Sequence, residues 1–280
     1  MDNDGNSSYT ERELLRSLPV GLRGQVRAER RTAMLRCITG LRGYVLAARD
    51  GEIGRCRDFL FDDQHWTIRF MVADTGKWLP GRKVLVSPMF LGEPDWSWNR
   101  FPVDLTRQQI DDSPPLDEHM PVSRRFERRY YDHYDIPIYW GGAAAWSAYP
   151  TTAGLLSDEG KQDNKPEDDD EDAHLQSADD VIGYHISARD GEIGHLDDLI
   201  VEAGSWTVRN IVVDTRNWLP GRRVMFSPDW VKEVDWSDRK LTVNRYTQEI
   251  RNCPDYDPAA PVNKEHEERF YDYLGRPRQW

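Results

Sequence analysis

The chain has 280 residues, of which 49 are aspartate or glutamate and 37 are lysine or arginine, giving a formal net charge of −12. This negative charge disfavours a nucleic-acid-binding protein, because such binding draws much of its affinity from contacts between basic side chains and phosphates. Three cysteines without a CxxC spacing argue against a disulfide framework or a zinc site and suit a reducing cytoplasm. No stretch approaches the roughly 18 to 20 consecutive apolar residues of a transmembrane helix.

Residues 1–33 are an N-terminal extension rich in arginine and glutamate. The segment "SSYTERELLRSL" predicts at best a short helix after Ser8, and the basic-then-apolar pattern of a signal peptide is missing. We expect this extension to be disordered, or to be an artefact of the assumed start of translation, because the repeat described next begins at Met34.

The rest of the chain is a tandem duplication with an offset of 140 residues. "GYVLAARDGEIG" returns as "GYHISARDGEIG", and "DTGKWLPGRKVLVSP" from Asp74 returns as "DTRNWLPGRRVMFSP" from Asp214. The alignment needs no gap. Because a unit of this length can bury a core of its own, the sequence predicts two globular domains, residues 34–140 and residues 174–280.

Each unit begins with predicted strands. "YVLAAR" and "EIGRCRDFLFD" predict two strands joined at Asp50-Gly51, a strong signal for a two-residue hairpin that Asp190-Gly191 repeats. The third strand, "WTIRFMVAD" or "WTVRNIVVD", is apolar on both faces toward its end, which indicates a strand that is covered on both sides. A type II proline-glycine turn, a fourth strand in "KVLVSP" and a fifth in "RFPVDL" or "KLTVNR" follow.

Short helices follow the strands. Thr106 and Gln109 have the spacing of a capping box and predict the start of a first helix. A second helix is predicted in "SRRFERRYYDHY" and in its counterpart "NKEHEERFYDYL". Many short strands with regular turn signals, followed by helices, predict a mainly β fold with short helices in which each unit is a small antiparallel barrel.

Residues 141–173 separate the two units and contain "DEGKQDNKPEDDDEDA". A block of like charge this poor in apolar residues predicts a disordered acidic linker. Its simplest role is a solvated tether, and a sharper hypothesis is an acidic lure for a basic partner. A linker of this length can join separate barrels or barrels packed as an intramolecular pseudo-dimer, and a homo-oligomer is also left open.

The motifs "ARDGEIG", "WT.R" and "V.DT..WLPGR.V..SP", which occur in this order in both units, resemble the PRC-barrel family. That family is named for the cytoplasmic domain of the photosynthetic reaction centre H subunit and includes the C-terminal domain of a ribosome maturation factor. The resemblance covers both units almost end to end and implies a strongly bent antiparallel sheet closed into a barrel. More closely, the chain is similar to bacterial tandem PRC-barrel proteins. The H subunit's transmembrane helix and the ribosome factor's additional barrel are not expected here, so the resemblance implies a fold without a function.

An enzyme with a site in each unit should place its reactive groups at matching positions. None of the seven histidines has a histidine as its counterpart, and no HExxH, GxSxG or P-loop motif occurs. Carboxylates do match, and the pairs are Asp50 and Asp190, Glu52 and Glu192, Asp58 and Asp198, and Asp74 and Asp214. A functional interpretation would make two of them a general acid and base, or a cation site. A structural role fits each pair better, and for the hairpin-turn pair Asp50 and Asp190 and the strand-end pair Asp74 and Asp214 we expect hydrogen bonds from local backbone N–H groups. The sequence therefore predicts a protein that is not an enzyme, with no catalytic residue, cofactor or metal.

The repeated "WLPGR" loop supplies the candidate interaction residues, because tryptophan and arginine dominate binding hot spots. A competing interpretation is that the tryptophan folds back over a mouth of its own barrel while the arginine pairs with a carboxylate such as Asp74. We expect the other matched tryptophans, Trp66, Trp206, Trp96 and Trp236, in the core. The candidate residues are Trp78, Leu79, Arg82, Trp218, Leu219 and Arg222.

These observations predict a cytoplasmic adaptor that binds an unidentified protein partner. Two similar surfaces on one chain raise the effective concentration of the second contact once the first has formed. The alternative is a sensor of a small ligand or an ion, with pockets at the barrel mouths that are lined by the Trp78 and Trp218 loops. A ligand that stabilises the protein only while these tryptophans are present would favour the sensor.

Overall fold

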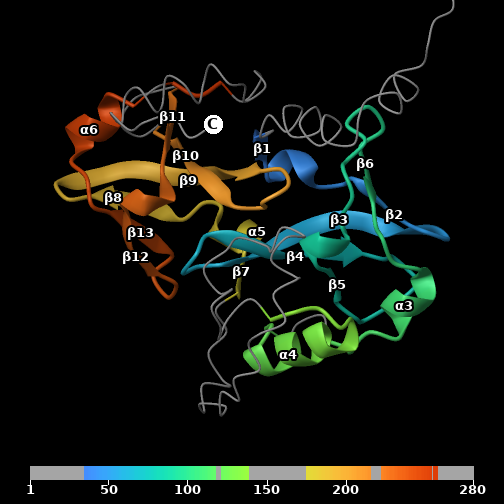
Figure 1. The fold of residues 1–280 in the computed structure, drawn as a ribbon. Helices are drawn as coiled ribbons and strands as arrows, with labels where there is room; N and C mark the ends of the chain where they lie inside the picture. Colours follow the sequence, from blue (N-terminus) through green and yellow to red (C-terminus); the bar gives the residue numbers. More distant parts are fainter. Residues whose placement is uncertain (1–34, 118–120, 139–174, 216–221, 254, 258–280) are drawn as a thin grey trace, which may run out of the picture. The chain divides into compact units, whose positions relative to one another are not determined.

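A computed structural model describes residues 35–117, 121–138, 175–215, 222–253 and 255–257, and within them the fold is mainly β (Figure 1). The extension and linker predicted at residues 1–33 and 141–173 lie outside the described residues. The first repeat contains β1 (Leu35–Cys37), β2 (Val45–Ala48), β3 (Gly51–Asp62), β4 (Thr67–Asp74), β5 (Val84–Val86) and β6 (Arg100–Pro102), followed by helices α3 (Arg107–Asp111) and α4 (Arg124–His133). The second repeat contains β7 (Leu175–Ser177), α5 (Ala178–Val181), β8 (His185–Ala188), β9 (Gly191–Glu202), β10 (Val208–Asp214), β11 (Arg223–Phe226), β12 (Val231–Asp235), β13 (Lys240–Val243) and α6 (Thr247–Arg251).

Each repeat forms one sheet, with strand order β5-β4-β3-β2-β6 in the first and β11-β10-β9-β8-β13-β12 in the second. The prediction of purely antiparallel sheets is wrong at one pair in each, because β2 pairs with β6 and β8 pairs with β13 in parallel. In the first repeat the strands from β2 to β6 alternate in direction along the chain, so β6 runs the same way as β2. The pairing of β6 with β2 curls the first sheet back on itself. Among the described residues, however, no pairing joins β5 to β6, so the sheet is not closed into a barrel.

The strands predicted from the sequence are present at the expected places. β4 is buried at every residue except its last, which confirms a strand covered on both sides. The hairpin after β2 lies one residue earlier than predicted, because Ala48 pairs with Gly51 and the two-residue turn is Arg49-Asp50. Asp50 does not have a positive φ, so the unusual backbone conformation falls on Gly51, with φ 149°.

The helix starts follow the predicted capping chemistry in the first repeat. Thr106 accepts a hydrogen bond from the Gln109 backbone N–H, and the Gln109 side chain accepts one from the Thr106 N–H, which confirms the capping box at α3. Ser123 caps α4 in the same way through the Phe126 N–H. The corresponding helix of the second repeat was predicted within residues 258–280, which lie outside the described part. No helix among the described residues is both long and apolar enough to cross a bilayer.

The first strand of each repeat pairs with the sheet of the other repeat, a feature that the sequence did not predict. β1 runs antiparallel to β9, and β7 runs antiparallel to β3. The Ile38 N–H extends the first of these pairings by donating to the Leu199 carbonyl at 2.9 Å. The repeats thus exchange their first strands, so each sheet is completed by residues from the other half of the chain.

The "WT" pair that both repeats contain lies at this junction. Trp66 and Trp206 both have a positive φ, 51° and 57°. The Trp66 carbonyl accepts a hydrogen bond from the Val208 N–H at 2.7 Å, and the Trp206 carbonyl accepts one from the Ile68 N–H at 2.8 Å. Because each bond is the counterpart of the other under the 140-residue offset, the two repeats meet with approximate two-fold symmetry.

One hydrophobic cluster contains buried side chains from both repeats. Trp206 is 7% exposed and stacks on Phe59 of the first repeat, with ring centroids 5.9 Å apart, which confirms its expected place in the core. The other three matched tryptophans, Trp66, Trp96 and Trp236, are half-buried and pack against this cluster rather than lying within it. The repeats therefore bury apolar surface against one another.

Candidate interaction surface

The "WLPGR" loop of the first repeat connects β4 to β5. Trp78 and Leu79 are half-buried and pack against the hydrophobic cluster. The Arg107 guanidinium lies over the Trp78 ring, 4.8 Å from its centroid. Gly81 has φ 72°, the conformation that a type II turn requires after proline. These contacts favour the interpretation in which Trp78 packs over its own repeat. The corresponding residues of the second repeat, Trp218 and Leu219, lie outside the described residues.

Arg82 fastens this loop to the end of α3. Its guanidinium donates to the carbonyls of Asp111 at 2.7 Å, Ile110 at 3.1 Å and Ser113 at 2.6 Å. Ile110 and Asp111 are the last residues of α3 and Ser113 follows the helix, so Arg82 binds carbonyls at the helix C-terminus, where intrahelical N–H donors run out. Arg82 does pair with a carboxylate, as the competing interpretation expects, but the partner is Asp111, at 3.6 Å, and not the Asp74 that was named as an example, because the side chain reaches the helix end.

Arg222 makes the same attachment in the second repeat. It donates to the carbonyls of Arg251 at 2.7 Å and Cys253 at 2.8 Å, and it also contacts the Asp255 carboxylate. Arg251 and Cys253 lie at and just after the end of α6, the counterpart of α3. The duplicated arginine therefore has a structural explanation in both repeats, since it satisfies the carbonyls at a helix C-terminus.

Three of the matched carboxylates, those of Asp50, Asp74 and Asp190, accept hydrogen bonds from backbone N–H groups at turns and helix starts. Asp74 accepts a hydrogen bond from the Gly76 N–H at 2.9 Å, which is the local turn that the sequence predicts. Asp50 and Asp190 instead reach the first N–H of the next helix, donated by Arg107 and Thr247, both at 2.8 Å. The expectation of a local partner is wrong for the latter pair, because these hairpin tips lie next to the N-termini of α3 and α6.

Asp58 and Asp198 lie at the junction between the repeats. Asp58 accepts hydrogen bonds from the Ser177 hydroxyl at 2.6 Å and the Asp179 N–H at 3.0 Å. Asp198 accepts a hydrogen bond from the Thr39 N–H at 3.2 Å, the counterpart of the Asp179 bond, and a second one from the Thr39 hydroxyl. Burial raises the pKa of both carboxyl groups despite these hydrogen bonds. Each carboxylate thus holds the segment that follows the exchanged strand of the other repeat.

Replacing Asp58 by asparagine should change how stability depends on pH. Because the pKa of Asp58 is higher in the folded chain than in the unfolded one, its contribution to the free energy of unfolding is fully present below the unfolded value, about 4. That contribution is lost as the pH rises through the folded-state pKa. Urea titrations at pH 7 and pH 4.5 should therefore show wild type gaining stability relative to Asp58→Asn on acidification.

Asp62 supplies a control of opposite sign. Burial opposes its ionisation, but Arg69, 3.2 Å away, and His65 outweigh that effect and lower its pKa. Its contribution is fully present above the unfolded pKa, about 4, and is lost as the pH falls through the lower folded-state value, so wild type should keep its advantage over Asp62→Asn between pH 7 and pH 4.5 and lose it toward pH 3. Equal pH slopes for the two variants would contradict the assignment of Asp58 to a raised pKa.

Two of the three cysteines, Cys37 and Cys56, have thiol pKa values that disfavour a reactive thiolate. Burial raises the pKa of Cys37 to about 11 and that of Cys56 further still. Cys37 lies in the exchanged strand β1, with its Sγ 2.6 Å from the Tyr256 hydroxyl. A thiol with a raised pKa is a poor nucleophile, so these two side chains act as core residues.

The most exposed large apolar side chain that the described ranges contain is Trp98, at 79%. It lies in the turn between Asp95 and Arg100, where the Asp95 carboxylate accepts hydrogen bonds from the N–H groups of Ser97, at 3.0 Å, and Trp98, at 3.2 Å. Backbone bonds of 2.8 and 3.1 Å between Asp95 and Arg100 close the turn. The backbone of Trp98 is thus fixed while its indole projects outward.

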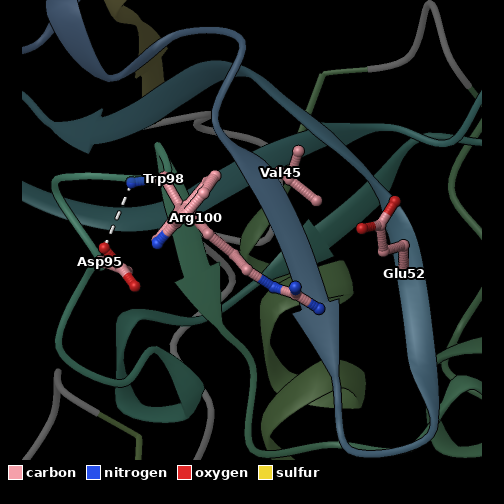
Figure 2. A pocket seen from close by; sticks show the side chains of 5 residues that line it. All are labelled: Val45, Glu52, Asp95, Trp98 and Arg100. Carbon is pink, nitrogen blue, oxygen red and sulfur yellow. Dashed lines mark hydrogen bonds between the residues drawn. The ribbon is translucent and has the colours of Figure 1, made fainter.

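This turn borders an open hollow of about 390 Å³, which is lined by Val45, Glu52, Asp95, Trp98 and Arg100. Figure 2 shows Trp98 and Arg100 on one side, Glu52 on the other and Val45 between them. We call these five residues the Trp98 surface. Its indole and guanidinium belong to Trp and Arg, two of the residue types that contribute most binding energy at protein interfaces. The carboxylates beside them add polar groups that can select a partner.

Sequence reasoning missed Trp98 because it selected residues that match between the repeats. Trp98 corresponds to Asp238, and Arg100 corresponds to Lys240. The turn itself is shared, since the Asp238 N–H donates to Asp235 at 2.9 Å. The signal that could have found this site was therefore the opposite one, a tryptophan at a polar turn in only one of two otherwise similar repeats.

No protein-family model matches the chain, and no curated protein is significantly similar to it.

Proposed function

We propose that this protein is a non-enzymatic protein-interaction module and that the Trp98 surface is its principal contact site. The observation that carries the proposal is the 79% exposure of a tryptophan on a turn fixed by backbone hydrogen bonds. An indole held in this way loses little conformational freedom on binding and offers a large apolar area to a partner. The partner that fits is a protein segment with an apolar side chain for Trp98 and a carboxylate for Arg100.

The two repeats have different roles in this proposal. The first carries the tryptophan and arginine, whereas the second carries Asp238 and Lys240 in their places. Reciprocal pairing of β1 with β9 and of β7 with β3 supports a rigid, composite arrangement in place of two sites that move independently. Any avidity between the two repeats then depends on a fixed spacing more than on the linker.

The identification of both repeats as PRC-barrel units is part of the proposal. It is supported by the shared succession of strands before a short helix and by the parallel pairing of the last strand before that helix, β6 or β13, with β2 or β8. A reducing cytoplasmic environment is also proposed, in keeping with three cysteines that are free and buried or half-buried.

Replacing Trp98 by aspartate tests the proposed contact site. Because the second repeat keeps the same turn with aspartate at this position, Trp98→Asp should leave the fold intact. Loss of a central tryptophan typically costs at least about 2 kcal/mol of binding free energy, so affinity should fall by more than tenfold. The measurement is quantitative capture of proteins from host lysate by wild type and variant, followed by titration of the enriched partner.

The matched control is Tyr246→Thr, which removes another exposed aromatic residue and installs the threonine of the first repeat at the same position. This variant should capture the same partner as wild type. Retention of that partner by a folded Trp98→Asp protein would contradict the proposed site.

The sensor is a second candidate, because a hollow of about 390 Å³ falls within the usual volume range of small-molecule sites. In this version the ligand would bind at the Trp98 surface, and not in a pocket at the barrel mouth beside Trp78 as the sequence suggested. A compound that raises the melting temperature of wild type but not of Trp98→Asp would favour the sensor over the adaptor.

A further inference from the structure

Two histidines lie side by side on the second sheet. His185 in β8 and His195 in β9 are directly opposite in the antiparallel register, and their ring centroids are 4.4 Å apart. His185 is exposed and His195 is half-buried. We propose that this pair binds one divalent transition-metal ion, of the class of Zn²⁺, Ni²⁺ or Cu²⁺.

Cross-strand geometry gives the pair its chelating capacity. Directly opposite residues of an antiparallel pair point to the same face, with Cβ atoms about 4.5 to 5.5 Å apart. Two imidazoles at this separation can each place a nitrogen about 2.0 to 2.1 Å from a single ion. Among the described residues, neither ring has a hydrogen-bond partner, so the ring nitrogens are available as ligands.

The neighbouring strands set the charge around the pair. Asp214 in β10 is opposite His195, and Lys240 in β13 is opposite His185. The Asp214 carboxylate favours a cation, as does the overall charge of −12. Lys240 opposes it, but its side chain is exposed and its four-carbon stem lets the ammonium turn away into water.

Solvent must complete the coordination sphere. The part of the chain that the structure describes contains no group of three or more histidine, cysteine and acidic side chains arranged to hold a metal. A two-imidazole site keeps open positions for water, which distinguishes it from a closed structural site. Imidazole ligands suit late divalent transition metals, and we expect the site to bind Cu²⁺ more tightly than either Ni²⁺ or Zn²⁺.

The first repeat provides an internal comparison. Val45 and Arg55 occupy the corresponding positions and form the same cross-strand pair. The Arg55 guanidinium donates to the Gly43 carbonyl at 2.9 Å. The metal site would therefore exist in the second repeat alone, and substitutions to the residues of the first repeat are compatible with this type of sheet.

Calorimetric titration of the full, tag-free chain with NiCl₂ at pH 7.5 tests the site. Wild type should bind one ion, and His185→Val and His195→Arg should each weaken binding by at least about tenfold. His133→Tyr, which removes another exposed histidine and installs its counterpart from the second repeat, should bind as wild type does.

The electron paramagnetic resonance spectrum of wild type with one equivalent of Cu²⁺ identifies the ligands without any substitution. Splitting from two imidazole nitrogens supports the site, and splitting from fewer than two overturns it. Failure of wild type to bind Ni²⁺, or binding that survives both His185→Val and His195→Arg, also overturns the proposal.

Discussion

Residues 34–140 and 174–280, produced as two separate polypeptides, are expected to fold stably only after association. Alone, the first polypeptide has no β7 to pair with β3, and the second has no β1 to pair with β9. Each would also expose the aromatic side chains that meet in the shared cluster, such as Phe59 and Trp206. Each unpaired strand leaves backbone groups without partners, and the exposed rings lose the apolar burial that stabilises the pair.

Circular dichroism during urea titration measures this expectation. Each half alone should unfold at low urea without a sharp transition, whereas an equimolar mixture should unfold cooperatively, at a midpoint that rises with protein concentration. Because the repeats are similar, a half that folds only as a homodimer with a second copy of itself would also reflect strand exchange. A monomeric half that unfolds as cooperatively as the full chain would contradict the arrangement.

The intact chain supplies the control for covalent linkage. A protease site inserted between residues 141 and 173 allows the folded protein to be cut after purification. Because β1, β7 and the bonds from Trp66 and Trp206 join the halves without crossing the linker, the cut chain should elute at the volume of the uncut one. Separation of the two fragments under native conditions would count against the exchanged strands.

The local features of the fold were predictable from the sequence. The capping box of Thr106 and Gln109, the buried β4 and the type II turn at Gly81 each depend on residues within a few positions of one another. Local chemistry is sufficient to specify such elements. The partner of Arg82, by contrast, lies about thirty residues away at the end of α3, and no local pattern identifies it.

Strand exchange could not be predicted for a related reason. β1 and β7 have three residues each, and their sequences fit the edge of either sheet because the sheets are homologous. The sequence left an intramolecular pseudo-dimer open without indicating that strands cross between the repeats. The choice depends on contacts such as that of Asp58 with Ser177, which are separated by more than a hundred residues.

The candidate sites show the cost of relying on internal symmetry. Matching positions between repeats select residues that the fold needs, such as Arg82 and Asp58. Trp98, His185 and His195 were passed over because their counterparts are Asp238, Val45 and Arg55. When a domain duplicates, a new binding function needs only one copy, so unmatched exposed residues carry more information about function than matched ones.

Substituting alanine for Gly54 should destabilise the protein by at least about 3 kcal/mol. A Cβ at this position would lie 2.1 Å from the Asp74 carbonyl oxygen, and Gly54 has φ 138°. The obstacle is backbone, so no side-chain rotation can relieve it. Gly194 repeats the geometry, with 2.0 Å to the Asp214 carbonyl oxygen. The last glycine of "ARDGEIG" therefore lets β3 and β9 pass close to the end of the next strand.

Gly43→Ala separates this contact from the cost of backbone conformation. Gly43 also has a positive φ, 80°, but nothing lies within 4 Å of a Cβ built there. Its substitution should cost only about 1 to 2 kcal/mol, the usual penalty of a left-handed conformation for a residue with a Cβ. Urea denaturation of both variants measures the difference directly. If Gly54→Ala unfolds at the same midpoint as Gly43→Ala, the close passage of β3 past Asp74 is not what this glycine provides. If Gly54→Ala unfolds at a much lower urea concentration than Gly43→Ala, the close passage of β3 past Asp74 explains why both repeats keep this glycine.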